Sequence, residues 1–127
     1  MVGGAPEGEV MIFKRVLEIL EAEVIVDAKD EGLEILSVCN TDLMSDLLHF
    51  SIKPNPILIT GLTNTQVVRT AEIADIKAIA FVLNKRPDEE VIELARRKDV
   101  PLIVTKLSKF TACGRLYVEG LRSCTEN

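Results

Sequence analysis

Polar residues with anion-binding chemistry follow three apolar runs of the sequence. The runs ILIT (57–60), AIAFVL (78–83) and LIV (102–104) are each followed by a short segment rich in hydroxyl, amide and cationic side chains. Such groups bind phosphates and carboxylates, especially beside helix N-termini. These segments carry almost no carboxylates, so we expect them to bind an anion or a phosphorylated small molecule. The candidate ligand-binding residues are Gly61, Thr63, Asn64, Gln66, Arg69, Asn84, Lys85, Thr105, Lys106 and Ser108. Arg86 belongs to the same segments.

The first of these segments also has a purely structural interpretation. Thr63 and Gln66 have the spacing of a capping box, in which each side chain bonds the backbone N–H of the other residue at the start of a helix. Gly61 is then explained by a turn with positive φ. Lys85 and Arg86 similarly read as a solvated turn before Pro87, which suits the first position of a helix. Capping and ligand contact are compatible, because a capped helix still presents free N–H groups.

The elements that position these segments alternate along the chain. Helical patterns at 65–74 and 88–98 separate the three apolar runs, and a last helix begins near residue 107. Runs that are apolar at consecutive positions are typical of parallel strands covered on both faces. We therefore predict an α/β fold with an open, mostly parallel sheet flanked by helices. The carboxyl ends of its strands meet at one edge, where ligands bind in such sheets.

The N-terminal half has a less regular pattern. A helix is predicted from Ile12, and two strands (23–28 and 33–39) surround the turn KDEG, which suggests a hairpin or an excursion before the main sheet. A further helix is predicted over 40–50. Its expected features are a cap at Asn40 or Thr41, Asp42 in the first turn, and a buried stripe of Leu43, Leu47 and Phe50.

Composition indicates one ordinary globular domain. The chain has 127 residues, of which 47% are apolar and 28% charged, with a net charge of -5. This length supports one core, and we place the domain at 12–121 between a loose N-terminal tail (1–11) and a C-terminal tail (122–127). The acidic balance and the 4% aromatic content argue against nucleic acid as a partner.

The cysteines lack metal-ligand spacing. Cys39, Cys113 and Cys124 form no CxxC pair, and the odd count predicts reduced thiols in a cytoplasmic protein. We expect no metal and no cofactor. The sequence also has no apolar run long enough to cross a bilayer and no signal-peptide pattern at its start, so no membrane association is predicted.

Linear signatures of the common enzyme classes are absent. The sequence has no GxxxxGK[ST], GxGxxG, GxSxG or HExxH motif. The single histidine, His49, is expected at a surface, and the cysteines are expected as small core residues. Asp42 and Asp46 are spaced to share a helix face, which is more often a solvated edge than a cation site. An enzyme without a linear signature, using Lys106 or a cysteine, is the weakest alternative.

The order of segments resembles the DRTGG domain. The resemblance rests on LMSDLL (43–48), ILITG (57–61) and the long stretch from IKAIAFVL to GRLYVEGL (76–121). KLSKFTACGRLY (106–117) is similar to the ending of stand-alone members encoded near iron-only hydrogenases. Where many members have an Asp-Arg pair after the strand and glycine, this chain has LTNTQ (62–66), with Arg69 as a candidate replacement for the cation.

The resemblance implies a regulatory or ligand-sensing module, often dimeric, and not a catalyst. We therefore expect a homodimer that binds a small anionic ligand or nucleotide at the edge of the sheet. The alternative is a protein interaction module whose partner is a hydrogenase-related or signalling protein. Its motivation is the last helix, which has more apolar side chains than one core-facing stripe needs. These residues are Phe110, Leu116, Tyr117, Val118 and Leu121.

Overall fold

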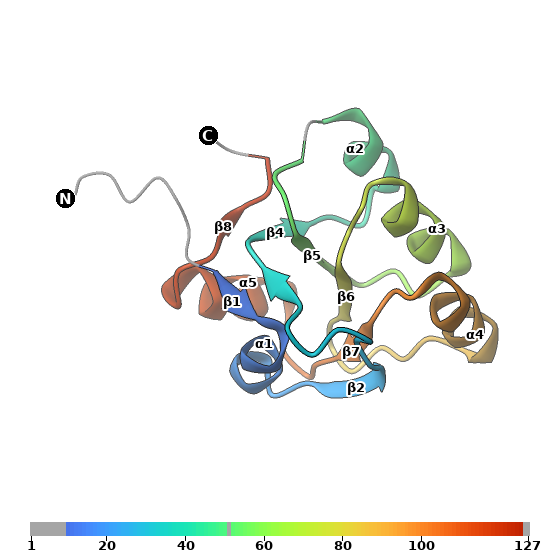
Figure 1. Cartoon of the computed structure of the whole chain (residues 1–127), viewed down its shortest axis with the longest axis horizontal. Coiled ribbons are helices and arrows are strands. Elements are labelled where there is room, and N and C mark those ends of the chain that lie inside the picture. Colours follow the sequence, from blue (N-terminus) through green and yellow to red (C-terminus); the bar gives the residue numbers. More distant parts are fainter. Residues whose placement is uncertain (1–9, 51, 126–127) are drawn as a thin grey trace.

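A six-stranded sheet forms the centre of the protein (Figure 1). The computed structural model describes residues 10–50 and 52–125. The strands lie in the order β2-β7-β6-β5-β4-β8, and all neighbours are parallel except β2, which runs antiparallel to β7. Their bounds are β2 Glu23–Val26, β4 Ser37–Asn40, β5 Pro56–Thr60, β6 Ala78–Phe81, β7 Leu102–Val104 and β8 Arg122–Ser123. The predicted mostly parallel α/β sheet is confirmed.

The three apolar runs lie side by side and point the same way. Ile57 of β5 pairs with Ala78 of β6, and Ile79 of β6 pairs with Leu102 of β7. Their segments therefore leave the sheet at one edge, as the sequence predicted.

Helices cover both faces of this sheet (Figure 1). One face carries α1 (Phe13–Leu20) and α5 (Lys109–Val118), and the other carries α2 (Met44–His49), α3 (Thr65–Ile73) and α4 (Glu89–Lys98). Each face has its own apolar core, and alternate residues of a strand enter different cores. In β5, Ile57 and Ile59 contact the α1 and α5 side, while Leu58 contacts the α2 to α4 side. All five residues of β5 are buried, which explains why its residues 57–59 are apolar without interruption.

Of the two interpretations of the N-terminal half, a hairpin or an excursion before the main sheet, the hairpin is wrong. β2 and β4 lie on opposite sides of the β5–β6 pair and do not bond each other. Between them the chain forms β3 (Glu34–Ile35), which pairs with β1 (Met11–Ile12) in a small separate antiparallel sheet. In this arrangement β4 gains parallel partners on both sides, β5 and β8, where a hairpin would supply one.

The folded part of the chain is longer at both ends than the predicted domain 12–121. Met11 is only 6% exposed and pairs with Ile35, so it belongs to the folded domain, and residues 1–9 lie outside the described residues. At the other end, the expected tail 122–127 contains β8, which adds to the sheet beside β4. Cys124 is 2% exposed and lies in the core. The folded unit therefore extends at least from Met11 to Cys124.

Two of the three cysteines are joined, which corrects the prediction of reduced thiols. Cys39 of β4 and Cys124 after β8 form a disulfide with a Cα–Cα distance of 5.3 Å across a sequence separation of 85. Cys113 is free. The pairing arises because β8 lies parallel to β4, which no spacing in the sequence reveals. The cysteine count therefore no longer supports a reducing compartment. The cytoplasmic location stays a prediction.

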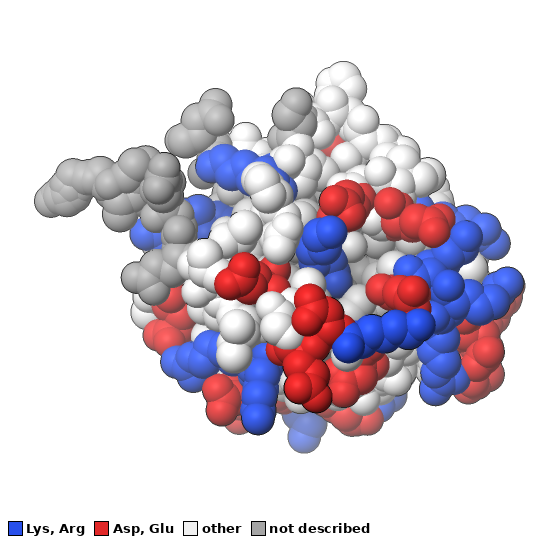
Figure 2. All heavy atoms as spheres, in the orientation of Figure 1, with Lys and Arg blue, Asp and Glu red and all other residues white. Residues whose placement is uncertain are grey.

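The helix predicted over 40–50 is shorter, and the residues that it buries are not those predicted. α2 begins at Met44 and has no side-chain cap, since the Thr41 hydroxyl accepts a bond from the N–H of Leu43 outside the helix. Met44 and Leu47 are buried, but Leu43 and Phe50 are 59% and 53% exposed, contrary to the predicted stripe. Figure 2 shows a largely uncharged surface around α2, whereas lysines, arginines and acidic residues are interspersed over the lower part of the same face.

Candidate ligand-binding site

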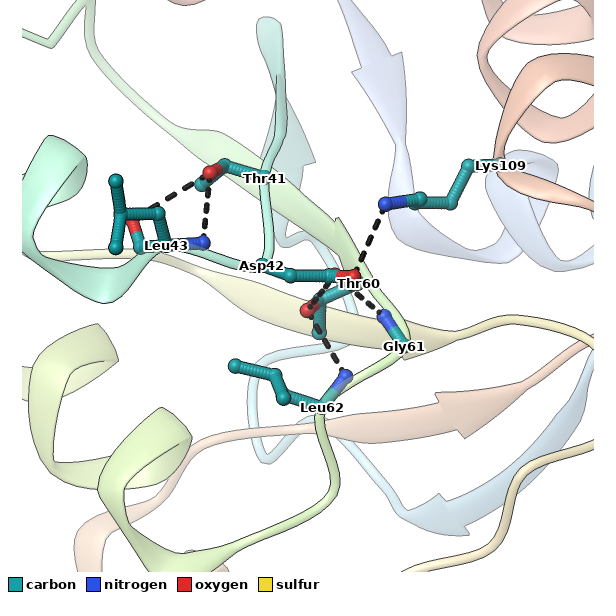
Figure 3. Close-up of polar contacts among 7 residues, drawn as sticks. All are labelled: Thr41, Asp42, Leu43, Thr60, Gly61, Leu62 and Lys109. Atoms are coloured by element: carbon teal, nitrogen blue, oxygen red, sulfur yellow. Dashed lines mark hydrogen bonds and ion pairs between the residues drawn. The ribbon is translucent and has the colours of Figure 1, made fainter.

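One carboxylate holds three elements together at the carboxyl edge of the sheet (Figure 3). Asp42 lies between β4 and α2, and its Oδ1 accepts hydrogen bonds from the Thr60 hydroxyl at 2.8 Å and the Gly61 N–H at 2.9 Å. Its Oδ2 accepts from Lys109 Nζ at 3.1 Å. Thr60 ends β5 and Lys109 begins α5. We call these four residues the Asp42 bracket.

The bracket stabilises the ionised form of Asp42. Its pKa is lowered from 3.8 to about 2, chiefly by the Gly61 N–H bond, with further contributions from Thr60 and Lys109 that outweigh partial burial. Asp42 is therefore fully ionised at neutral pH and has its oxygens occupied by donors. A carboxylate in this state is a poor general base.

The sequence interpretation missed Asp42 because it placed this residue in a helix. The three predicted segments carry no carboxylate, but Asp42, which lies outside them, brings one to the same edge. The signal lies in the strand before it: β4 ends at Asn40, so Asp42 follows a parallel strand by two residues, as Leu62 follows β5. Residues at that position reach the edge where ligands bind in parallel sheets.

Gly61 does not have the positive φ that the sequence interpretation gave it. Within the described residues, Gly120 is the glycine with positive φ, at 114°. A Cβ built on Gly61 would lie 3.2 Å from Lys85 Nζ and 3.7 Å from Asp42 Oδ2. The missing side chain thus lets Lys85 and Asp42 approach the same point. The Lys109 ammonium group bonds this carboxylate, and the Lys85 ammonium group lies beside Gly61.

The cap of α3 is Asn64, one residue later than predicted. Its Oδ1 accepts from the Val67 N–H at 3.2 Å, which replaces the expected capping box of Thr63 and Gln66. Gln66 and Arg69 are exposed on α3, and Thr63 is half-buried before it.

The second predicted segment is divided between structural contacts and solvent. Asn84 adopts positive φ and donates its N–H to the Thr105 carbonyl at 2.8 Å. Arg86 pairs with Glu23 of β2, which lowers the pKa of the Glu23 carboxyl. The turn therefore anchors β2, and Pro87 precedes the cap Asp88 of α4 instead of starting the helix.

The third segment is largely committed to folding. Thr105 is 1% exposed, and its hydroxyl donates to the Leu20 carbonyl at 2.6 Å, which fixes the end of α1 to the sheet. Ser108 caps α5 by accepting from the Thr111 N–H at 3.2 Å. Lys106 is exposed. The predicted residues that meet at one point are thus Gly61 and Lys85, together with the unpredicted Asp42 and Lys109.

A cavity of about 680 Å³ lies beside this edge, where β4 and β8 end between α2 and α5. Two cations, Lys53 and Arg122, and one carboxylate, Asp46, line it. The Arg122 guanidinium lies 4.5 Å from the centre of the Tyr117 ring, which also lines the cavity. The remaining lining residues are Val38, Cys39, Asn40, Thr41, Leu47, Phe50, Cys113, Leu121, Ser123, Cys124 and Thr125. None of the ligand-binding residues predicted from the sequence is among them.

The free thiol in this wall is not activated. Burial raises the pKa of the Cys113 thiol, and the charge of Lys109 only partly opposes this. The thiol form therefore dominates at neutral pH, which disfavours a nucleophilic role. His49 is exposed against the Phe50 ring, as expected for a surface histidine.

No helix in the described part of the chain is long and apolar enough to cross a membrane. Within residues 10–50 and 52–125, no group of three or more histidine, cysteine or acidic side chains is arranged to hold a metal ion.

Comparisons with known proteins agree on the fold. A solved structure of the CBS and DRTGG domains of the regulatory region of Clostridium perfringens pyrophosphatase, complexed with its activator diadenosine tetraphosphate, is similar, with a TM-score of 0.66 at 17% identity. The match covers 87% of this chain and 47% of that one, so this chain spans about half of its length. A search of the curated proteins gives no match. The family model of the DRTGG domain matches residues 15–117, and the chain therefore belongs to the DRTGG domain family.

Proposed function

We propose that this protein is a non-enzymatic regulatory module that binds a small anionic metabolite or a nucleotide and works as a homodimer. The ligand occupies the cavity between α2 and α5, next to the loops that the sequence singled out. The site acts by binding the ligand and does not catalyse a reaction.

The cavity is the observation that carries this proposal. Its volume of about 680 Å³ lies within the range of about 300–1,000 Å³ typical of small-molecule sites. Lys53 and Arg122 outnumber the one carboxylate, Asp46, so the lining favours an anion. Tyr117 and Phe50 add aromatic rings against which a base can stack.

The side chains with catalytic chemistry argue for binding without turnover. Asp42 is held ionised by three donors, and the pKa of Cys113 is raised. Neither group is poised near neutral pH to move a proton or attack a substrate.

Calorimetric titration and thermal-shift measurements with nucleotides and phosphorylated metabolites test the proposal. The panel includes dinucleoside polyphosphates, because the regulatory region of the similar pyrophosphatase is complexed with diadenosine tetraphosphate. We expect at least one compound to bind, and we expect Arg122→Gln and Lys53→Gln each to weaken it about tenfold, as loss of one charged contact does.

Matched variants separate the cavity from the loops predicted earlier. Arg97→Gln, an exposed change on α4, should leave binding unchanged. Lys85→Gln and Lys106→Gln test the loops: a loss confined to these variants would move the site out of the cavity. The absence of any response across the whole panel would contradict the ligand-binding function.

A protein interaction module is the second candidate, favoured by the outer side of α5. Phe110, Tyr117 and Val118 are 88%, 61% and 79% exposed, whereas Leu116 and Leu121 of the predicted apolar set are buried. Recovery of the chain with a defined hydrogenase-related or signalling protein, abolished by Phe110→Asp, together with a monomeric chain in isolation, would favour this candidate over the homodimer.

A further inference from the structure

A disulfide lies in the wall of the proposed ligand cavity. Cys39 of β4 and Cys124 after β8 are bonded, and both residues line the cavity of about 680 Å³. Each of them is only 2% exposed. Because the bond borders the cavity and is otherwise buried, a small thiol in solution would reach it through the cavity.

The disulfide fixes a short segment that supplies much of the cavity wall. Residues 121–125 all line the cavity, and β8 lies within them at the edge of the sheet. The two residues of β8 pair with Ser37 and Val38 of β4, and the Cys124 N–H donates to the Val38 carbonyl at 2.9 Å. An edge strand with so few pairs belongs to the parts of a protein that open most readily. A covalent bond at its end therefore decides how often it leaves the sheet.

The same segment sets the position of both cations of the cavity. Arg122 donates to the carbonyls of Tyr117 at 3.3 Å and Leu121 at 3.0 Å, and its guanidinium lies over the Tyr117 ring. The backbone N–H of Lys53 donates to the Cys124 carbonyl at 2.8 Å. Release of β8 would thus withdraw Arg122 from the cavity and remove the contact that places Lys53 beside it.

The third cysteine lines the same cavity but is poorly suited to exchange with the bond. Burial raises the pKa of the Cys113 thiol, and the charge of Lys109 only partly opposes this. The thiolate is the form that attacks a disulfide. Reduction at neutral pH therefore depends on a thiol from outside the chain.

We propose that the Cys39–Cys124 disulfide is a redox switch that holds β8, and with it the cations of the cavity, in the ligand-binding position. A small dithiol reduces it in two exchanges. One thiolate of the dithiol attacks a protein sulfur to form a mixed disulfide, and the second displaces that sulfur. The dithiol leaves as its cyclic disulfide, and two electrons and two protons remain on the Cys39 and Cys124 thiols. The effect on affinity rests on the proposed function, whereas the release of β8 does not.

Hydrogen exchange measured by mass spectrometry tests the release of β8 without a ligand. Treatment with dithiothreitol should accelerate exchange in the peptide that contains 122–125 about tenfold or more. The central strand β6 should keep its slow rate, which shows that the fold survives. The double variant Cys39→Ser with Cys124→Ser should exchange like the reduced wild type, with or without dithiothreitol. Cys113→Ser, which retains the disulfide, should respond like the wild type.

Two results of this experiment would overturn the switch. One is an unchanged exchange rate at 122–125 after reduction. The other is equal acceleration in β6 and in 122–125, because the bond would then stabilise the whole fold and not this segment.

Calorimetric titration with ATP and diadenosine tetraphosphate tests the consequence for binding. Reduction should raise the dissociation constant of a compound that binds about tenfold, as loss of one charged contact does. The double variant should bind as weakly as the reduced wild type and should not respond to dithiothreitol. Equal affinity of the oxidised and reduced wild type would overturn the switch. If neither compound binds the oxidised protein although reduction releases β8, the proposed function fails for these compounds and the redox control of β8 stands.

Discussion

Asp42 joins the ends of two strands to the start of a helix. Its two oxygens receive the Thr60 hydroxyl, the Gly61 N–H and the Lys109 ammonium group. Thr60 is fully buried, so its hydroxyl depends on this one carboxylate for an acceptor. Asp42 also holds the Lys109 side chain at the start of α5.

Replacing Asp42 by alanine should destabilise the protein by about 2 kcal/mol, because the buried Thr60 hydroxyl and the Gly61 N–H lose their acceptor. Asp42→Asn retains one oxygen and should cost about half as much. Urea unfolding measures both. Glu31→Ala, an exposed change in a turn, is the control, and equal losses at Glu31 and Asp42 would show that the bracket contributes no stability.

The bracket also predicts a dependence on pH. The folded pKa of Asp42 is about 2 against an ordinary value of 3.8, so its ionised form stabilises the fold above about pH 4 and this contribution is lost as the pH falls towards 2. Asp42 is 43% exposed, so solvent screening reduces the contribution to about 1 kcal/mol. The difference in unfolding free energy between the wild type and Asp42→Asn should shrink over this range, and a constant difference from pH 6 to pH 2 would contradict the assignment.

The starts of the helices show how far local sequence patterns predict the capping residues. Asp88 and Ser108 cap α4 and α5 with their own side chains, whereas the sequence interpretation placed Pro87 at the first position of a helix and began the last helix near residue 107. In α3 the predicted Thr63 cap is displaced to Asn64. Both residues are good caps, so the sequence alone does not distinguish them. The choice depends on where the chain leaves β5 and how Val67 and Val68 enter the core.

This correction is testable at the level of one element. Asn64→Ala should destabilise the protein by about 1 kcal/mol, since the Val67 N–H loses its side-chain acceptor. Thr63→Ala should change stability by less than about 0.5 kcal/mol. Thermal or urea unfolding measures the loss of stability in each variant. A larger loss for Thr63→Ala than for Asn64→Ala would show that Thr63 caps the helix, as the predicted capping box requires.

At the scale of the whole molecule, the disulfide ties the last strand to the interior of the sheet. Cys124 and Cys39 close a loop with a sequence separation of 85, and both line the cavity. The bond restricts the unfolded chain and keeps β8 beside β4, so the cavity wall depends on it.

Loss of this bond should destabilise the protein by about 4 kcal/mol, as expected for a loop of this length. Cys124→Ser, or reduction of the wild type with a dithiol, should lower the urea midpoint by corresponding amounts. Cys113→Ser controls for removal of a thiol and should change stability by less than about 1 kcal/mol. If reduction has no effect on the wild type, the two cysteines are not bonded in solution.

The sequence by itself determined the parallel core and its cover of helices. Strands buried on both faces need consecutive apolar residues, so β5, β6 and β7 were readable from their own composition. The shared edge of the sheet followed from their common direction, which brought Gly61 and Lys85 to one place. The excess of apolar residues on the last helix was also readable, but the sequence did not show which of them are exposed.

Only the tertiary structure decided which distant segments meet. β2, β4 and β8 are not buried along their whole length as β5, β6 and β7 are, and their neighbours are chosen by the packing of the whole sheet and not by local pattern. That choice places Cys124 beside Cys39, brings Asp42 to Thr60 and Lys109, and encloses the cavity with Lys53 and Arg122. These contacts join residues far apart in the chain, and local sequence chemistry carries no information about such separations until the strand order is known.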